Sequence, residues 1–127
     1  MMLCGIHQPN FLPYFGFFDK LKKSDIFIIH DDAQFVKRDW HHRNQILVNK
    51  RRFWLTVPIK KHSSIEKINN IKIKNEQKIK YLDWREYHLF QIRENYKKTK
   101  NFANIYHGLS RIYLKDHGNI ADLNIEL

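Results

Sequence analysis

The chain has 127 residues, 43% of them hydrophobic and 14% aromatic, which suffices for one packed domain and excludes a wholly disordered protein. Its formal net charge of +10 favours anionic partners such as nucleotides, nucleic acid or anionic lipid surfaces. A single cysteine, Cys4, excludes an internal disulfide and a cysteine-rich zinc site, so we expect it to pack as a small apolar residue.

The first part of the chain predicts a strand–helix–strand unit. Residues 2–6 and 25–30 are short apolar runs typical of buried strands. Between them, residues 13–23 carry aromatic and leucine side chains at helical spacing, with Pro13 suited to the first turn and lysines at the end. Such a unit gives two parallel strands with a right-handed crossover, and it predicts an α/β fold built on a partly parallel, mixed sheet.

The middle of the chain predicts an antiparallel addition to that sheet. Residues 45–48 and 53–58 are rich in β-forming residues, and the segment 49–52 between them reads as a hairpin with a basic tip. Residues 68–73 alternate as a further strand. The polar run 31–44 is too dense in charged and amide groups to form core.

The last part of the chain predicts two amphipathic helices. Apolar residues recur every three to four positions over residues 76–98 and again over residues 102–114. Residues 122–127 begin another apolar run with no cap or closing strand. No linker or internal repeat divides the sequence, so we expect residues 1–127 to form one domain.

The basic excess belongs to the middle of the chain, where residues 37–100 hold 18 Lys and Arg against 6 Asp and Glu. The chain is also rich in Lys, Ile and Asn together, a bias of general residue usage that makes a solvated basic face the simpler interpretation. No window has the length of apolar sequence that a membrane span needs, and no secretory signal precedes the first strand, so we expect a cytoplasmic protein.

Two polar segments follow the two predicted parallel strands. In open α/β sheets, ligands bind beyond the carboxyl ends of the strands, where loops and helix N-termini offer donors to anions. Residues 7–10 and 31–44 both occupy such positions, so one pocket can be lined by both. His7 can act there as acid or base, and Asp31 or Asp32 can orient a hydroxyl or hold a metal such as magnesium.

Each of these polar residues also has a purely structural interpretation. His7 can serve as a loop histidine that satisfies backbone groups, and the two aspartates can form a turn with an ion pair to Lys37 or Arg38. His88 has the position of a partly buried helix histidine, and the three tryptophans are better placed for packing than for stacking on bases. Adjacent His41 and His42 cannot share one face of a helix or strand, which argues against a zinc pair.

The common signatures of dinucleotide-binding, P-loop and α/β-hydrolase proteins are absent. Three successive blocks nevertheless resemble the WbqC-like family, and residues Trp84, His88, Tyr96 and Phe102 resemble its helical block. The blocks are residues 7–20 (HQPNFLPYFGFFDK), residues 31–40 (DDAQFVKRDW) with Arg43 and Asn44, and residues 54–58 (WLTVP).

The resemblance implies a bacterial protein of O-antigen and surface-polysaccharide synthesis that modifies a nucleotide-linked or related sugar. Acyl, aminoacyl and nucleotidyl transfer all remain open. Members of that family are about twice as long, so the resemblance implies an N-terminal portion whose missing half a partner chain can supply, and which can be inactive alone. The predicted site has His7 and Asp32 as catalytic residues, with substrate or phosphate binding by Gln8, Asn10, Asp31, Gln34, Lys37, Arg38, Arg43, Asn44 and His88.

The histidine-bearing loop after the first strand is also similar to that of nucleotidyl-transferring enzymes of the HUP class, which adds a Rossmann-like or HUP-like three-layer sheet to the expected fold. Their histidine doublet is not present, because Gln-Pro-Asn follows His7. Two other functions compete with a transferase. One is a nucleic-acid-binding module that grips phosphates with residues 50–52, although no recognised DNA- or RNA-binding motif occurs. The other is a non-catalytic remnant of the family.

Overall fold

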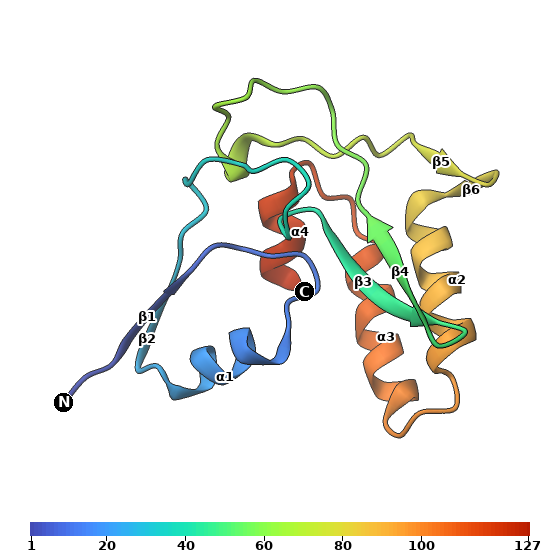
Figure 1. The fold of residues 1–127 in the computed structure, drawn as a ribbon, viewed down its shortest axis with the longest axis horizontal. Helices are drawn as coiled ribbons and strands as arrows, with labels where there is room; N and C mark the ends of the chain where they lie inside the picture. The colour runs from blue at the N-terminus through green and yellow to red at the C-terminus, as the bar shows by residue number, and fades with distance from the viewer.

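The computed structural model describes residues 1–127 as a mixed α/β arrangement with four helices and three separate two-stranded sheets. The N-terminal unit consists of strand β1 (Cys4–His7), helix α1 (Phe15–Lys23) and strand β2 (Ile26–Ile29). Its strands pair in parallel from Cys4↔Ile26 to His7↔Ile29, which confirms the predicted strand–helix–strand unit. Figure 1 shows this unit at one end of the molecule, on the side away from helices α2 and α3.

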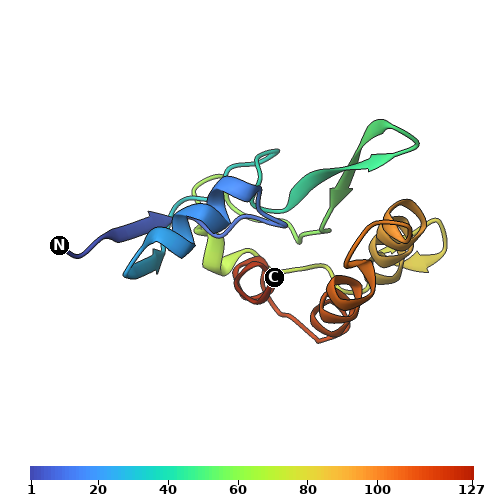
Figure 2. The ribbon, with the colours of Figure 1, turned by 90° about the horizontal axis from the view of Figure 1, so that it is seen from below.

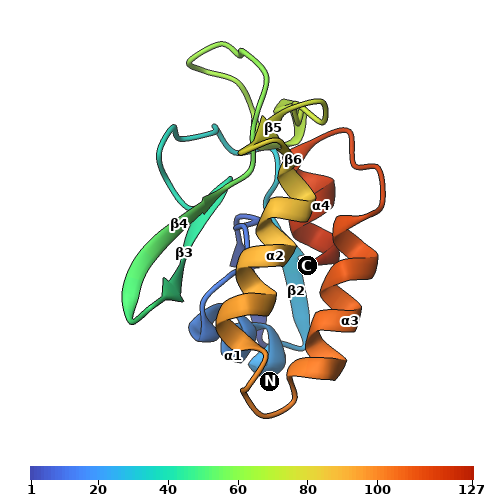
Figure 3. The same cartoon turned by 90° about the vertical axis from the view of Figure 1, so that its right-hand side faces the viewer.

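The central hairpin consists of strands β3 (Arg43–Val48) and β4 (Arg51–Thr56), which pair antiparallel. Its turn is shorter than predicted: only Asn49 and Lys50 connect the strands, and both have positive φ, as a two-residue hairpin turn requires. Arg51 and Arg52 therefore begin β4. Figure 3 shows the hairpin standing beside α2, where the Leu47 backbone N–H donates to the Tyr96 hydroxyl at 2.9 Å.

The C-terminal part holds helices α2 (Trp84–Tyr96), α3 (Phe102–Tyr113) and α4 (Ile120–Glu126). The first helix starts later than predicted because the Asp83 carboxylate accepts the Arg85 backbone N–H and caps α2 there. Residues before it form the small hairpin of β5 (Lys78–Ile79) and β6 (Leu82–Asp83). The apolar run at the end of the sequence belongs to α4, which Asn119 caps by accepting the Asp122 N–H.

The strand predicted over residues 68–73 does not form: Ile68–Asn70 are a short 3-10 helix, η1, and Lys72 and Ile73 make only isolated antiparallel bridges, to Asn119 and Ile59. Ile68 in η1 and Ile71, which caps it, are both fully buried, because residues three apart face the same side of a 3-10 turn. This side packs against α4, which Figure 2 shows between the N-terminal unit and helix α3. These residues are apolar because they pack against α4, and not because they form a strand of a sheet.

The three-layer arrangement built on one mixed sheet is not what the structure forms, because β1–β2, β3–β4 and β5–β6 share no strand. Residues 31–42 leave β2 as a loop and carry the chain away from the sheet edge before the hairpin begins. Although this loop is polar, it is partly buried, since Phe35, His41 and His42 are 3%, 1% and 9% exposed.

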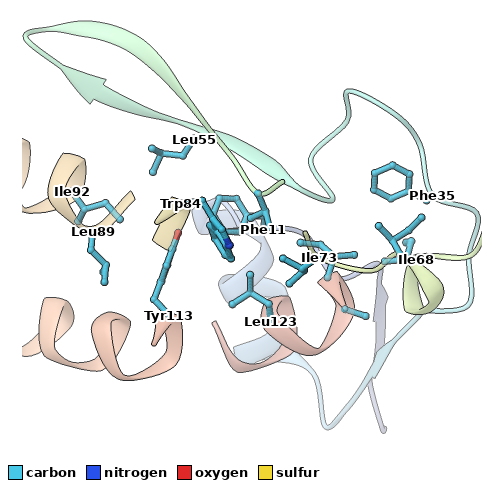
Figure 4. Packing of buried hydrophobic residues seen from close by; sticks show 14 residues of the cluster. Phe11, Phe35, Leu55, Ile68, Ile73, Trp84, Leu89, Ile92, Tyr113 and Leu123 are labelled. Carbon is cyan, nitrogen blue, oxygen red and sulfur yellow. The ribbon is translucent and has the colours of Figure 1, made fainter. Parts of the chain in front are cut away.

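The main core is a cluster of 14 buried residues drawn from the hairpin, the three C-terminal helices and the loops. Figure 4 shows Trp84 and Phe11 in its middle, with Leu89 and Ile92 on one side and Ile68 and Ile73 on the other. No residue of β1, α1 or β2 belongs to this cluster. The N-terminal unit instead has its own small aromatic contact, in which the Phe17 ring lies 5.5 Å from Phe27 and 5.0 Å from His7.

Candidate functional site

The carboxyl ends of β1 and β2 bring two polar loops together at one edge, as the parallel pairing predicts. His7 ends β1, His30 follows β2, and the His30 backbone N–H donates to the His7 carbonyl at 2.8 Å. The loop after β1 also joins the loop after β2, because the Phe11 N–H donates to the Trp40 carbonyl at 2.9 Å. The two loops therefore form one continuous surface.

A cavity of about 380 Å³ opens between these loops, and we call it the histidine cavity. The His7 Nδ1 lies 2.7 Å from the Gln8 carbonyl, so Nδ1 is the donor of this hydrogen bond and Nε2 is the ring nitrogen left for a ligand. His30 also lines the cavity, and its Nε2 lies 2.9 Å from the Asp32 carboxylate. The residues lining the cavity are Ile6, His7, Gln8, Asn10, His30, Asp39, Trp40 and His41.

His41 holds the two loops in register from a buried position. Its Nε2 donates to the Gln8 side-chain oxygen at 2.7 Å, and its Nδ1 accepts the Val36 N–H at 3.3 Å. Burial lowers the pKa of His41, which keeps the ring neutral and suits this donor–acceptor pair. His41 is therefore a positioning residue that fixes the Gln8 amide at the cavity wall.

Helix α4 ties the same loops to the main core through a single buried amide. The Asn124 Nδ2 donates to the Pro9 carbonyl at 2.9 Å and to the His41 carbonyl at 2.8 Å. Asn44 at the start of β3 adds a second tie, because its Nδ2 donates to the Leu12 carbonyl at 2.7 Å. The site is thus held from behind by groups that do not reach the histidine cavity.

A second and larger cavity, of about 710 Å³, is lined by the next residues of the same loop, including His42 and Arg43, and we call it the cationic cavity. Five Lys and Arg side chains line it, no Asp or Glu does, and none of the five forms an ion pair in the structure. The residues lining it are Phe35, Lys37, Arg38, His42, Arg43, Thr56, Ile59, Lys60, Lys61, His62 and Ser64.

Two nitrogen atoms of the residues lining the cationic cavity are buried without a hydrogen-bond partner. One is the His42 Nε2, whose ring is oriented by Nδ1 donating to the Val57 carbonyl at 3.2 Å. The other is the Arg43 Nε, whose guanidinium lies 4.0 Å from the Trp54 ring centroid and donates through Nη2 to the Arg38 carbonyl. Burial lowers the pKa of His42, and neighbouring Arg43 and His62 lower it further.

The structure divides the predicted site residues into three groups. His7, Gln8 and Asn10 line the histidine cavity, whereas Lys37, Arg38 and Arg43 line the cationic cavity. Neither cavity contains both His7 and Arg43. The remaining predicted residues line neither of these two cavities: Asp31, Asp32, Gln34, Asn44 and His88.

His88 lies in the main core, as the structural interpretation of this residue expected. It is 1% exposed, and its Nε2 and Nδ1 lie 3.1 Å from the Thr56 carbonyl and 3.2 Å from the Tyr113 hydroxyl. Burial lowers the pKa of His88 to about 4. Gln34 also has a structural contact, since its amide donates to the Ser64 carbonyl at 2.8 Å. Cys4, expected to pack inside, is exposed.

The predicted site residues do not include several residues that line the two cavities. His30 directly follows the second strand, and the parallel register alone places it beside His7. Lys60, Lys61 and His62 follow the hairpin, and only the tertiary fold returns them to the loop of residues 35–43. No group of three or more His, Cys, Asp and Glu side chains is arranged to hold a metal ion. None of the helices combines the length and apolar character that crossing a bilayer requires.

Fold and site together define a mixed α/β protein with two polar cavities, one of them at the ends of a short parallel strand pair and the other lined by residues 35–43 and 56–64. The chain belongs to the WbqC-like protein family, whose pattern matches residues 8–127. It is 37% identical over 128 residues to the uncharacterized protein Rv1507c of Mycobacterium tuberculosis (strain ATCC 25618 / H37Rv). This alignment covers 100% of the chain and 53% of the relative, so the chain spans about half the relative's length. No solved structure matches the chain.

Proposed function

We propose that the chain binds a phosphate-bearing small molecule, of the nucleotide or sugar-nucleotide class, in the cationic cavity. The observation that carries this proposal is the set of five Lys and Arg side chains facing one cavity without a single carboxylate. Like charges held together raise the free energy of the empty site, and a bound phosphate relieves that repulsion. Arginine can bind phosphate through paired hydrogen bonds, and lysine acts as a point charge.

The two buried nitrogens without partners indicate which chemical groups the ligand carries. An unpartnered buried polar atom costs about 1–3 kcal/mol, so the His42 Nε2 and Arg43 Nε favour a ligand that supplies polar oxygens at depth. The neutral His42 ring offers a lone pair to a protonated phosphate oxygen, and the protonated ring donates to an ionised one. Because both atoms are buried, a small phosphate group fits them better than the regular backbone of a duplex, whose phosphates lie along an extended surface.

Membership of the WbqC-like family supports placing this binding in surface-polysaccharide synthesis, with the chain contributing to group transfer onto or from a nucleotide-linked sugar. The histidine cavity suits the proton transfer that such a reaction needs. The Nδ1 of His7 is engaged by the Gln8 carbonyl, which leaves Nε2 to face a substrate, and Asp32 orients His30 in the same cavity. Asp32 thereby acts through His30 and does not itself reach the cavity. In acyl, aminoacyl and nucleotidyl transfer alike, an acceptor hydroxyl or amine gives up a proton, and a histidine at this position can accept it.

Calorimetric titration with pyrophosphate, a nucleoside diphosphate and a sugar nucleotide tests the proposal. Replacing Arg43 or the pair Lys60 and Lys61 by alanine removes charge-assisted contacts, and we expect each change to weaken binding about 10-fold or more. The matched control replaces Lys50 and Arg52 on the hairpin, which are exposed and lie outside both cavities. Absence of binding, or equal weakening by the hairpin variant, would contradict the proposal.

A nucleic-acid-binding role is the second candidate, because the β3–β4 hairpin stands out beside α2 with Lys50, Arg51 and Arg52 exposed (Figure 3). A gel shift with duplex DNA at two salt concentrations separates the candidates. If the hairpin grips phosphates, the affinity falls steeply with salt and depends on Lys50 and Arg52. If the cationic cavity is the functional site, the hairpin variant leaves pyrophosphate binding unchanged.

A further inference from the structure

The parallel strand pair is covered on one face only. Phe17 of α1 packs on Phe27 and His7, and a side chain at Gly5 would meet the Ser24 hydroxyl, so alternate residues of both strands face α1. The opposite face, which we call the outer face, carries Cys4, Ile6, Ile26 and Ile28. The register Cys4↔Ile26 and Ile6↔Ile28 places these four side chains together.

The outer face is apolar and open. Ile6, Ile26 and Ile28 are 52%, 47% and 46% exposed, and Cys4 is exposed as well. Figure 1 shows α1 on one side of β1 and β2 and no helix against the other side. Parallel strands almost always occur with both faces buried, and a two-stranded sheet leaves a row of backbone groups unpaired at each edge. This strand pair therefore lacks the cover that its type of sheet requires.

The length of the relative in M. tuberculosis offers one candidate for that cover. The region aligned with this chain is 53% of the relative, so nearly as much polypeptide again lies outside it. Parallel sheets grow by strand–helix units of about 30 residues, and the remaining length accommodates several of them. The outer face has no charged side chain among its four members, so a partner strand or helix can bury it without desolvating an ion.

We propose that the outer face of β1–β2 is a docking surface for an α/β polypeptide of the kind that forms the unaligned remainder of the relative. The cover adds at least one strand to the sheet and buries Cys4, Ile6, Ile26 and Ile28. Because Ile6 also lines the histidine cavity, the same cover closes one wall of that cavity. This inference is independent of the proposed phosphate binding, since no outer-face residue lines the cationic cavity.

Cys4 provides a reporter for the test, because it is the only cysteine and lies on the outer face. Residues 1–127 are fused to the part of the relative that lies outside the aligned region, in a cysteine-free form. The rate at which 5,5′-dithiobis(2-nitrobenzoate) modifies Cys4 is then measured in the fusion and in the chain alone. We expect modification in the fusion to be at least about 10-fold slower, because thiol reactivity follows exposure. The remainder added as a separate polypeptide should give the same protection and a 1:1 complex.

Charged substitutions locate the contact. Ile6→Asp with Ile28→Asp should restore fast modification of Cys4 in both formats, whereas Ile65→Asp, at a side chain that is 76% exposed elsewhere, should not. A second reporter, Leu47→Cys on the hairpin of a Cys4→Ser chain, should react equally fast with and without the remainder. Unchanged Cys4 reactivity in the fusion would overturn the proposal. So would protection of Cys4 in the chain alone as its concentration rises, because the occupant would then be a second copy.

Discussion

The N-terminal unit and the rest of the molecule use similar apolar sequences in different ways. Residues 45–127 combine with Phe11 and Phe35 to bury a continuous core around Trp84. The N-terminal unit is just as apolar in sequence, yet its β2 isoleucines 26 and 28 are nearly half exposed, and Phe17 is its only well-buried large side chain. Apolar content therefore indicates where burial is needed, and the surrounding chain decides whether it occurs.

The candidate site lies where these two regions meet. The N-terminal unit contributes the ends of its parallel strands, with His7 and His30. The packed region contributes the ties that hold the connecting loops, through Asn124 and Asn44. Such a division places the groups suited to chemistry on the region with less buried core and their supports on the region with more.

The largest contrast between the regions should come from Trp84→Ala and Phe17→Ala. Trp84 is 1% exposed in the middle of the core, so its truncation should lower the free energy of unfolding by about 3–5 kcal/mol. Phe17→Ala should instead loosen the N-terminal unit alone, with faster hydrogen exchange in β1 and β2 and unchanged protection in α2 and α3. Urea unfolding and hydrogen exchange measure both. Equal global destabilisation would show that the two regions unfold as one.

Acid should weaken the packed region. Burial lowers the pKa of His88 from 6.5 to about 4, so between these values the unfolded chain binds a proton that the native protein does not. The stability is present above pH 6.5 and is lost as the pH falls towards 4, by about 3 kcal/mol from this residue. The lowered pKa values of His41 and His42 act in the same direction. Unfolding curves from pH 7 to pH 4 measure the loss, and His88→Gln should reduce its slope.

The Asn124 hydrogen bonds between the two regions should contribute less to the free energy of unfolding than the core does. Asn124→Ala removes both hydrogen bonds to the Pro9 and His41 carbonyls, and we expect a loss of about 1–3 kcal/mol in the free energy of unfolding. The amides of residues 10–12 and 41 should also exchange faster. Asn104→Ala on the exposed side of α3 is the matched control and should change neither measurement. An unchanged Asn124→Ala protein would mean that α4 does not support the loops.

The smallest predicted effect concerns the hairpin turn. Lys50 has a φ of 63°, a backbone conformation that favours glycine. Lys50→Gly should therefore raise the free energy of unfolding by about 0.5–1 kcal/mol. Arg52→Gly, inside β4, should lower it, because glycine weakens a strand interior. Thermal unfolding of the two variants checks the opposite signs.

Much of the local structure could be predicted from the sequence. Short apolar runs and helical spacing indicated β1, α1, β2, the hairpin and the cores of α2 and α3, because these patterns repeat with the period of the element itself. The same reasoning failed where burial is irregular. Ile68 and Ile71 are buried on a 3-10 turn, and Asp83 starts α2 with a cap that shortens the predicted helix. In both places one local contact overrode the average pattern.

The sequence alone determined the WbqC-like relationship, the parallel pairing of the first two strands and, through that pairing, the meeting of the two polar loops. Only the tertiary structure separated the histidines from the cations into two cavities. The adjacent residues His41 and His42 line different cavities, and Lys60 and Lys61 join Arg43 because the chain returns to this loop after the hairpin. The direction of a side chain, and the return of the chain to a distant loop, depend on packing against segments far away in the sequence. A local pattern of residues therefore cannot predict them.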